Sequence, residues 1–295
     1  MAPPEIPMTD LDQESTVLSR VLVDRGRYFE GPRWHGGRLW TSDTLAQTVF
    51  SVGETGDCRP CVKLDDIPCG LGFLPSGDLV ILTMFGRRLL RHCEGGVELY
   101  ADLSGVAAGT IDDMVIDGRG RAYVGDLGFN LLTGAVSAPV GRLILVMPDG
   151  TVRVVADGLR FPNGIAVSDD GSTLIVAESQ GDCLAEFAIR PDGSLDLRRR
   201  FGSFGEPDGI CLDREGCVWV ASFKEDAFVR VAPTGEIVER ILRPGCRAVA
   251  CVLGGEDRKS LFLLTADTTG PELMQGRSQS RIEVVRVPVP GAGFP

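Results

Sequence analysis

Six short apolar segments recur along the chain, and this repeat constrains the fold more than any other feature. Each segment contains one landmark residue, and the landmarks are Trp40, Val80, Tyr123, Ile175, Trp219 and Phe262. Successive landmarks are 40, 43, 52, 44 and 43 residues apart. A turn containing glycine precedes most landmarks, and a hairpin of alternating apolar residues follows most of them. Short strands, glycine-containing turns and a period of this length are typical of four-stranded propeller blades.

Six such units predict an all-β fold, a six-bladed β-propeller that forms a single domain over residues 16–295. Residues 1–15 lie outside the repeat and are predicted to be a flexible N-terminal tail. Segments 17–23 and 281–287 flank the repeats, and we expect them to pair and close the ring, because an open sheet edge exposes unpaired backbone groups. The longest interval contains an insertion at 127–139, which is predicted to overhang one mouth of the channel.

Four repeats carry an oxygen-bearing side chain at the same point of the repeat. Glu30 lies 10 residues before its landmark, Asp112 and Asp208 lie 11 before theirs, and Asn163 lies 12 before its own. The innermost strand of a propeller blade lines the channel, so these side chains are predicted to form a ring around the axis. Without a cation, three carboxylates around a small opening would repel one another. A ring of oxygen ligands favours Ca²⁺, with Mg²⁺, Mn²⁺ and Zn²⁺ as alternatives.

An opposing interpretation treats each of these acids as an isolated turn residue, because Asp and Asn are frequent where strands begin. Four residues in phase favour the metal ring instead. By contrast, Asp117, Asp169 and Asp213 recur in the hairpin turns and are predicted to be structural. Strand alternation points Asp113 away from Asp112, so Asp113 is expected to orient its neighbour or a backbone amide from behind the ligands, with direct ligation of the metal as the alternative.

Composition excludes several classes of partner and reaction. The formal charge of −11 disfavours nucleic acid and anionic membranes as partners. No apolar run approaches the roughly 20 residues of a membrane span, and the first residues show no signal peptide. The nine cysteines are scattered and odd in number, which favours free thiols in a reducing cytoplasm. The two histidines, His35 and His92, lie in a turn and after an outer strand, which argues against a Ser-His-Asp hydrolase.

One pair of cysteines has a spacing like that of a zinc site. Cys58 and Cys61 are separated by two residues, but no second pair or histidine cluster follows, and only Cys69 is near. We therefore expect no zinc site there.

Several short motifs resemble those of one known family. They are Glu30-Gly31-Pro32, Asp112-Asp113 followed by Asp117 and Gly120, Pro162-Asn163-Gly164-Ile165-Ala166, and Pro207-Asp208-Gly209. In this order and spacing they resemble the senescence marker protein and gluconolactonase family of calcium-dependent propeller hydrolases. The resemblance implies a six-bladed propeller with a catalytic divalent ion in its central tunnel.

The resemblance also carries expectations for individual residues. Glu30, Asn163 and Asp208 fall on metal-ligand positions of the family. The position of Asp112 is usually Asn in the members that cleave sugar lactones or phosphotriesters, and Asp there resembles the bacterial drug-responsive lactonase branch. The sugar-lactone members tend to carry an Arg two residues earlier that grips substrate hydroxyls. This chain has Thr110 instead, which favours simple or apolar lactones.

The predicted activity is a calcium-dependent lactonase, a carboxylic ester hydrolase acting on a small-molecule lactone. Glu30, Asp112, Asn163 and Asp208 are the predicted metal ligands. Asp112 and Asp208 are the predicted catalytic residues, with Asp112 as the general base for water or, alternatively, as a nucleophile. Two other functions remain open, a phosphotriester or fluorophosphate hydrolase at the same ion and a non-catalytic propeller that binds a partner on its face. The sequence leaves the oligomeric state open.

Overall fold

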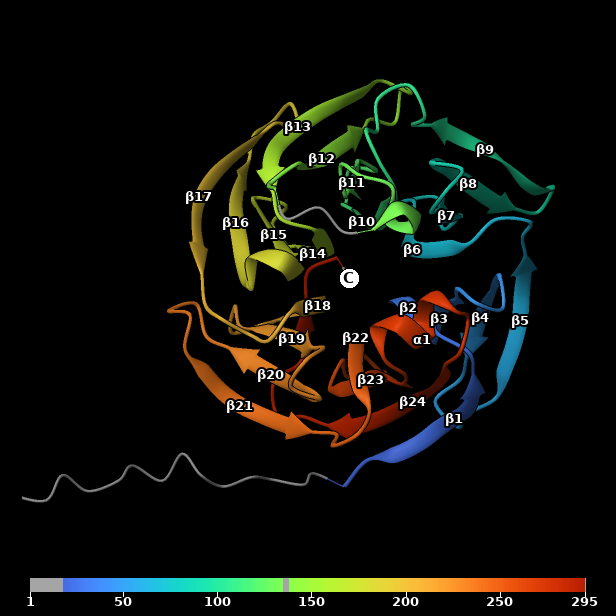
Figure 1. Cartoon of the computed structure of the whole chain (residues 1–295), viewed down its shortest axis with the longest axis vertical. Helices are drawn as coiled ribbons and strands as arrows, with labels where there is room; N and C mark the ends of the chain where they lie inside the picture. The colour runs from blue at the N-terminus through green and yellow to red at the C-terminus, as the bar shows by residue number, and fades with distance from the viewer. Residues whose placement is uncertain (1–17, 135–137, 295) are drawn as a thin grey trace, which may run out of the picture.

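Six antiparallel sheets surround a central channel in the computed structural model, which describes residues 18–134 and 138–294 (Figure 1). The innermost strands of the six blades are β2 (Phe29–His35), β6 (Pro68–Phe73), β10 (Ile111–Ile116), β14 (Pro162–Val167), β18 (Pro207–Asp213) and β22 (Arg247–Gly254). The second strands are β3 (Arg38–Asp43), β7 (Leu79–Thr83), β11 (Ala122–Asp126), β15 (Thr173–Glu178), β19 (Val218–Ser222) and β23 (Ser260–Asp267). Every landmark residue lies in a second strand, so the predicted six-bladed β-propeller is confirmed.

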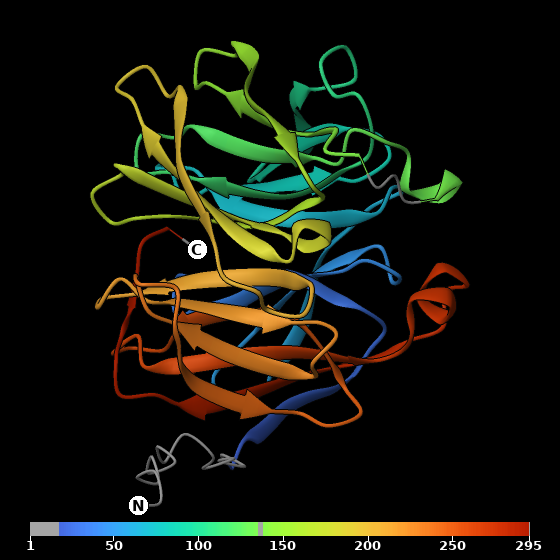
Figure 2. The ribbon, with the colours of Figure 1, turned by 60° about the vertical axis from the view of Figure 1, so that its left-hand side comes forward.

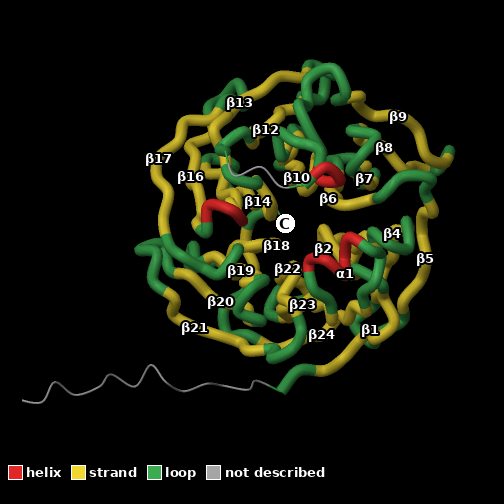
Figure 3. Tube along the Cα trace, in the orientation of Figure 1, coloured by secondary structure: helices red, strands yellow, loops and turns green. Residues whose placement is uncertain are grey.

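The outer half of each blade completes a four-stranded sheet. The third strands are β4 (Thr48–Val52), β8 (Arg88–Cys93), β12 (Gly141–Val146), β16 (Cys183–Ile189), β20 (Ala227–Val231) and β24 (Gln279–Arg286). The outermost strands are β5 (Cys58–Lys63), β9 (Gly96–Asp102), β13 (Val152–Leu159), β17 (Leu195–Phe201), β21 (Ile237–Leu242) and β1 (Arg20–Gly26). Short helical segments interrupt the strands at η1 (Leu131–Thr133), η2 (Ser179–Gly181) and α1 (Gly270–Met274) (Figure 3).

The apolar core lies between neighbouring blades rather than on the axis. Six clusters of buried side chains fill the six contacts between adjacent sheets. Because each sheet is covered on both faces, its second strand is buried along its whole length, as in β7 and β19. This explains why the landmark segments are continuously apolar instead of alternating.

The ring closes through strands from opposite ends of the chain. Strand β1 pairs antiparallel with β24, with Arg20 opposite Val284. The predicted pairing of the two flanking segments is therefore confirmed, and β1 becomes the outermost strand of blade six, where it covers the edge of β24. Val17 and the predicted tail over residues 1–15 lie outside the described residues. Among the residues that the structure describes, no helix is long and apolar enough to cross a membrane.

The C-terminal segment lies at one end of the channel. Strand β25 (Gly291–Ala292) pairs with the last residues of β18, Leu212 and Asp213. Phe294 then donates its backbone N–H to the carbonyl oxygen of Val167, the last residue of β14. Figure 2 shows this segment on one face of the propeller and both η1 and α1 on the opposite face. The first residues of the innermost strands therefore lie toward the face that carries η1 and α1.

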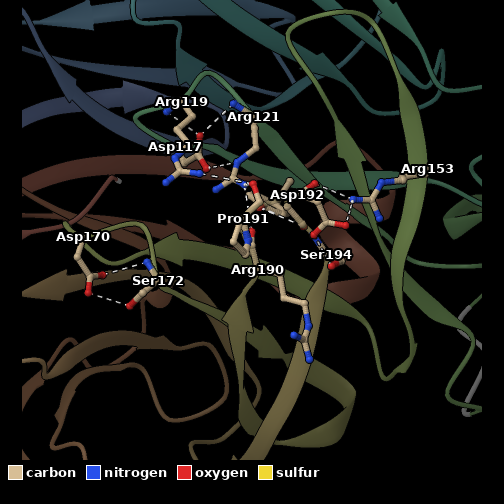
Figure 4. A network of polar contacts seen from close by, with 12 residues as sticks. Asp117, Arg119, Arg121, Arg153, Asp170, Ser172, Arg190, Pro191, Asp192 and Ser194 are labelled. Carbon is tan, nitrogen blue, oxygen red and sulfur yellow. Dashed lines mark hydrogen bonds and ion pairs between the residues drawn. The ribbon is translucent and has the colours of Figure 1, made fainter.

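The aspartates of the hairpin turns hold backbone amides and arginines at the C-terminal face. Asp117 accepts hydrogen bonds from the backbone of Arg119 at 2.9 Å and of Arg121 at 3.0 Å, and its other oxygen pairs with the Arg121 guanidinium at 2.7 Å (Figure 4). Asp213 has the same arrangement, with Arg230 as its ion-pair partner at 2.7 Å. The structural role predicted for these two turn residues is confirmed.

Candidate active site

The four oxygen-bearing residues occupy the same position in four blades. Glu30, Asp112, Asn163 and Asp208 are each the second residue of an innermost strand. All four line one pocket with a volume of about 470 Å³, at the end of the channel away from β25. The structure therefore brings these side chains together from segments that span 178 residues of sequence.

The same position in blade two is occupied by a cysteine. Cys69 is the second residue of β6 and lies 11 residues before its landmark Val80, and it also lines the pocket. Its thiol donates a hydrogen bond to Asp112 Oδ1 at 3.0 Å. Cys69 was not among the predicted site residues, although the count back from Val80 reaches it. In blade six, the pairing of β22 with β23 places the buried Val249 at the equivalent point, and its side chain has no atom that could bind a metal ion.

Small residues after the ring positions let adjacent strands approach closely. A Cβ atom on Gly164 would lie 2.5 Å from the carbonyl oxygen of Asp208, and one on Gly209 would lie 2.4 Å from the Cβ atom of Ala250. These contacts are too short for any side chain, so glycine is required at these two positions, where the innermost strands of blades four and five pass their neighbours. Blade three has Asp113 at this point instead.

Asp113 joins three blades behind the ring. Its Oδ1 atom accepts a hydrogen bond from the Arg33 guanidinium of blade one at 3.0 Å, and its Oδ2 atom accepts from the Ile165 backbone of blade four at 3.3 Å. Arg33 also donates to the Met114 carbonyl oxygen. Asp113 and Arg33 are both buried, and neither lines the pocket. Asp113 thus fixes the backbone beside Asp112, and its predicted role in orienting Asp112 stays a prediction.

The carboxylates of the ring resist simultaneous ionisation. Burial raises the pKa of Asp112 to about 6; the hydrogen bond from Cys69 lowers it and the charge of Asp113 raises it. Burial, followed by the charges of Asp208 and Asp112, holds the pKa of Glu30 well above its usual range. Burial and the charge of Asp112 do the same to the pKa of Asp208. Three carboxyl groups with raised pKa values in one pocket favour a compensating positive charge.

The donor set fits a hard divalent cation. Asp208 Oδ1 is buried and has no hydrogen-bond partner within the described chain. The Asn163 amide nitrogen donates to Ser179 Oγ at 3.2 Å, and that hydroxyl donates to the Pro207 carbonyl oxygen at 2.7 Å. The amide nitrogen donates to Ser179, and a hydrogen bond from Asn163 also lowers the pKa of Asp208, so the Asn163 amide oxygen is left as an acceptor. Among the described residues, no group of three or more His, Cys, Asp or Glu side chains is positioned to hold a metal ion, so Glu30, Asp112 and Asp208 do not form such a group without Asn163 or a movement of side chains.

A second layer of residues lies above the ring, two positions earlier in each blade. Tyr28, Ile67, Phe161 and Glu206 line the pocket at this level. Thr110, at the position for which the family resemblance implies a substrate-gripping Arg in sugar-lactone members, does not line it. Its hydroxyl oxygen instead accepts a hydrogen bond from the backbone of Leu131 at 3.0 Å and so anchors η1.

The insertion of blade three reaches the mouth of the pocket. Leu131 and Leu132 of η1 are lining residues, which confirms the predicted overhang for residues 127–134. Residues 135–137 of the insertion lie outside the described residues. On the other side of the mouth, Leu273 and Met274 of α1 also line the pocket.

This architecture agrees with comparisons to known proteins. The family model described as SMP-30/Gluconolactonase/LRE-like region matches residues 29–267. The chain belongs to this family. The match extends from the innermost strand of blade one to the second strand of blade six, so it includes every ring position. The family resemblance predicted from the ring motifs is confirmed.

Alignments with named relatives cover most of the chain. The chain is 26% identical over 266 residues to 6-deoxy-6-sulfogluconolactonase of Pseudomonas putida, and the alignment covers 87% of this chain and 89% of the relative. It is 30% identical over 260 residues to lactonase drp35 of Staphylococcus aureus (strain USA300), covering 81% and 78%. Among solved structures, a calcium-binding protein, regucalcin, from Agrobacterium tumefaciens superposes with a TM-score of 0.76 at 19% identity, covering 94% and 95%.

Proposed function

We propose that the chain is a metal-dependent lactonase. One observation carries this proposal: Glu30, Asp112 and Asp208 meet Asn163 at the floor of one pocket, with raised carboxyl pKa values and an unpartnered buried oxygen on Asp208. Catalytic sites are where burial and like charges shift pKa values in this way. Two of the named relatives are lactonases, which supports lactone hydrolysis as the reaction.

Glu30, Asp112, Asn163 and Asp208 are the residues that would hold the ion. Their oxygens suit Ca²⁺ first, with Mg²⁺, Mn²⁺ and Zn²⁺ as alternatives. When bound, the ion supplies Lewis-acid polarisation of the lactone carbonyl and neutralises the ring carboxylates. Asp208 would belong to the catalytic set as a ligand of that ion.

Asp112 is the proposed general base. In the ion-free chain burial raises the pKa of Asp112 to about 6, so the carboxylate is ionised at neutral pH and available as a base. Asp112 takes one proton from a water molecule, whose oxygen forms a bond to the carbonyl carbon. The ester C–O bond within the lactone ring then breaks, and the lactone's ester oxygen takes the proton back from Asp112. The product is a hydroxy acid. Direct attack by the Asp112 carboxylate remains the alternative route.

Two other functions compete with this proposal. A phosphotriester or fluorophosphate could be hydrolysed at the same ion, since the ring does not itself distinguish a carbonyl from a phosphoryl oxygen. A non-catalytic binding propeller would not require the ring to be intact. The protein is also proposed to be cytoplasmic, because all nine of its cysteines are free thiols.

A substrate panel with and without chelator separates these functions. We expect hydrolysis of small lactones that chelation abolishes and added Ca²⁺ restores. Faster turnover of a phosphotriester than of every lactone would favour the competing hydrolase. No turnover of any ester, together with no rise of Tm on adding divalent cations, would favour the binding propeller.

A further inference from the structure

We infer that the substrate lactone carries an apolar substituent, an alkyl chain or aryl group, which binds between η1 and α1 at the mouth of the pocket. This inference rests on the proposed function, because it assigns the substrate class of the same site. Figures 1 and 2 show η1 and α1 on the same face of the propeller. Leu132 of η1 is 63% exposed and Met274 of α1 is 55% exposed, and both line the pocket. Large apolar side chains gathered at the rim of a pocket mark a binding surface.

The η1 side of the mouth is held in place by local hydrogen bonds. Thr110 Oγ1 accepts from the backbone of Leu131 at 3.0 Å, and Asn130 Oδ1 accepts from the backbone of Leu132 at 3.0 Å. Thr110 is itself buried in the base of the insertion. The two leucines therefore lie on a turn that is already ordered, so less conformational entropy of the protein is lost when a substrate binds.

The α1 side is fixed by a capping box. The Thr269 side chain accepts from the backbone of Glu272 at 3.4 Å, and the Glu272 carboxylate accepts from the backbone of Thr269 at 3.1 Å. Such a reciprocal cap stabilises the start of a helix. Leu273 and Met274, the last two residues of α1, face the pocket from this side.

An aromatic wall connects this mouth to the floor of the pocket. Phe161 lines the pocket with a φ of +61°, in the left-handed region that a bulky side chain rarely adopts. Pro162 follows Phe161 in the chain. Phe129 packs edge-on against the Phe161 ring, with the two ring centroids 6.0 Å apart. A strained backbone retained at a pocket wall is typical of residues that position a ligand. The wall lies two residues before Asn163, directly above the ring.

The described lining of the pocket contains no cationic side chain that could bind a polar or anionic substituent. None of the described lining residues is Lys, Arg or His. Arg247, which is the blade-six equivalent of Phe161, pairs with Asp226 at 3.1 Å and is not a lining residue. The charged residue of this layer that does line the pocket is Glu206, whose carboxylate pairs with Lys224. A phosphate, sulfonate or carboxylate on the substrate would find no cationic lining side chain to pair with here, whereas an apolar group would be buried.

The test is a series of γ-lactones whose side chain lengthens from methyl to nonyl. We expect kcat/KM to rise about fourfold for each methylene until the mouth is filled, as expected for burial of a CH₂ group. In a Leu132→Ser, Met274→Ser double variant, the ratio of kcat/KM for the longest over the shortest lactone should fall about tenfold or more. Leu99→Ser is the matched control, because Leu99 is 58% exposed on the outer strand β9 and does not line the pocket. It should leave the ratio unchanged.

A binding measurement separates this inference from the proposed activity. γ-Lactams with the same side chains retain the ring and carbonyl but resist opening, and calorimetry gives their Kd. Lactam affinity that rises with chain length and weakens in the double variant supports the apolar mouth, even if no lactone is opened and the proposed activity fails. Lactone opening that is independent of chain length, or faster for gluconolactone, overturns the apolar mouth and leaves the activity standing.

Discussion

The Cys69 thiol donates a hydrogen bond to Asp112 Oδ1 across 3.0 Å and so links the innermost strands of blades two and three. Burial and the negative charges of Asp112 and Glu30 raise the pKa of Cys69 well above its usual range, so the thiol keeps its proton and remains a donor. The same hydrogen bond lowers the pKa of Asp112, against the larger effect of burial. The thiol therefore helps to keep the proposed base ionised near neutral pH.

Replacing Cys69 by Val should move the acidic limb of the kcat/KM profile to higher pH. The substitution removes the donor, so the pKa of Asp112 rises further above about 6 and its basic form appears only at higher pH. Cys69→Ser keeps a donor and should leave the limb nearer that of the wild type. Identical limbs in all three proteins would show that the hydrogen bond does not act on the base.

Asp112→Asn should preserve divalent-cation binding and slow lactone opening. An amide oxygen can still coordinate an ion but cannot accept a proton from water, so we expect kcat to fall by roughly 10²- to 10⁴-fold. Calorimetry of Ca²⁺ binding and steady-state kinetics check the two parts separately. An unimpaired Asp112→Asn enzyme contradicts the assignment of the base.

Asp208→Ala should abolish turnover while leaving the propeller folded. Its Oδ1 atom has no partner to lose, so the substitution removes a proposed ligand without breaking a hydrogen bond of that oxygen. Asp213→Ala, at the other end of the same strand, is the control. It breaks a buried ion pair with Arg230 and should cost about 3–5 kcal/mol of stability. Thermal melts should show a lower Tm for Asp213→Ala than for Asp208→Ala. Activity assays at low temperature should show turnover by Asp213→Ala and none by Asp208→Ala.

The chelated protein should lose stability as the pH rises from about 5 to about 7.5. Glu30, Asp112 and Asp208 have folded pKa values above their unfolded values, so their favourable contribution is present at low pH and is lost as pH rises through the folded pKa, about 6 for Asp112. Added Ca²⁺ should raise Tm more at the higher pH, because the ionised carboxylates bind it. A Ca²⁺ effect that does not depend on pH would contradict the predicted ligands.

The sequence alone determined the repeat and the phase of the ring. An apolar second strand and a glycine turn recur in every blade because each blade must bury the same two faces, so spacing along the chain reports position around the axis. Counting back from the landmarks located Glu30, Asp112, Asn163 and Asp208 for this reason. The same argument separated Asp117 and Asp213 as turn residues at the opposite end of the blade.

Only the tertiary structure decided what completes the site. Cys69 occupies the same position in its blade as the four oxygen-bearing residues. Its thiol can act on Asp112 only because the packing of blades two and three brings the two side chains together. Thr110 occupies the same position in its blade as the pocket-lining Tyr28 and Phe161, yet its hydroxyl oxygen accepts a hydrogen bond from the backbone of Leu131. The apolar mouth depends on where η1 and α1 lie, and these belong to the connections between β11 and β12 and between β23 and β24. Such contacts join residues far apart in sequence with no period to relate them, so only the folded chain specifies them.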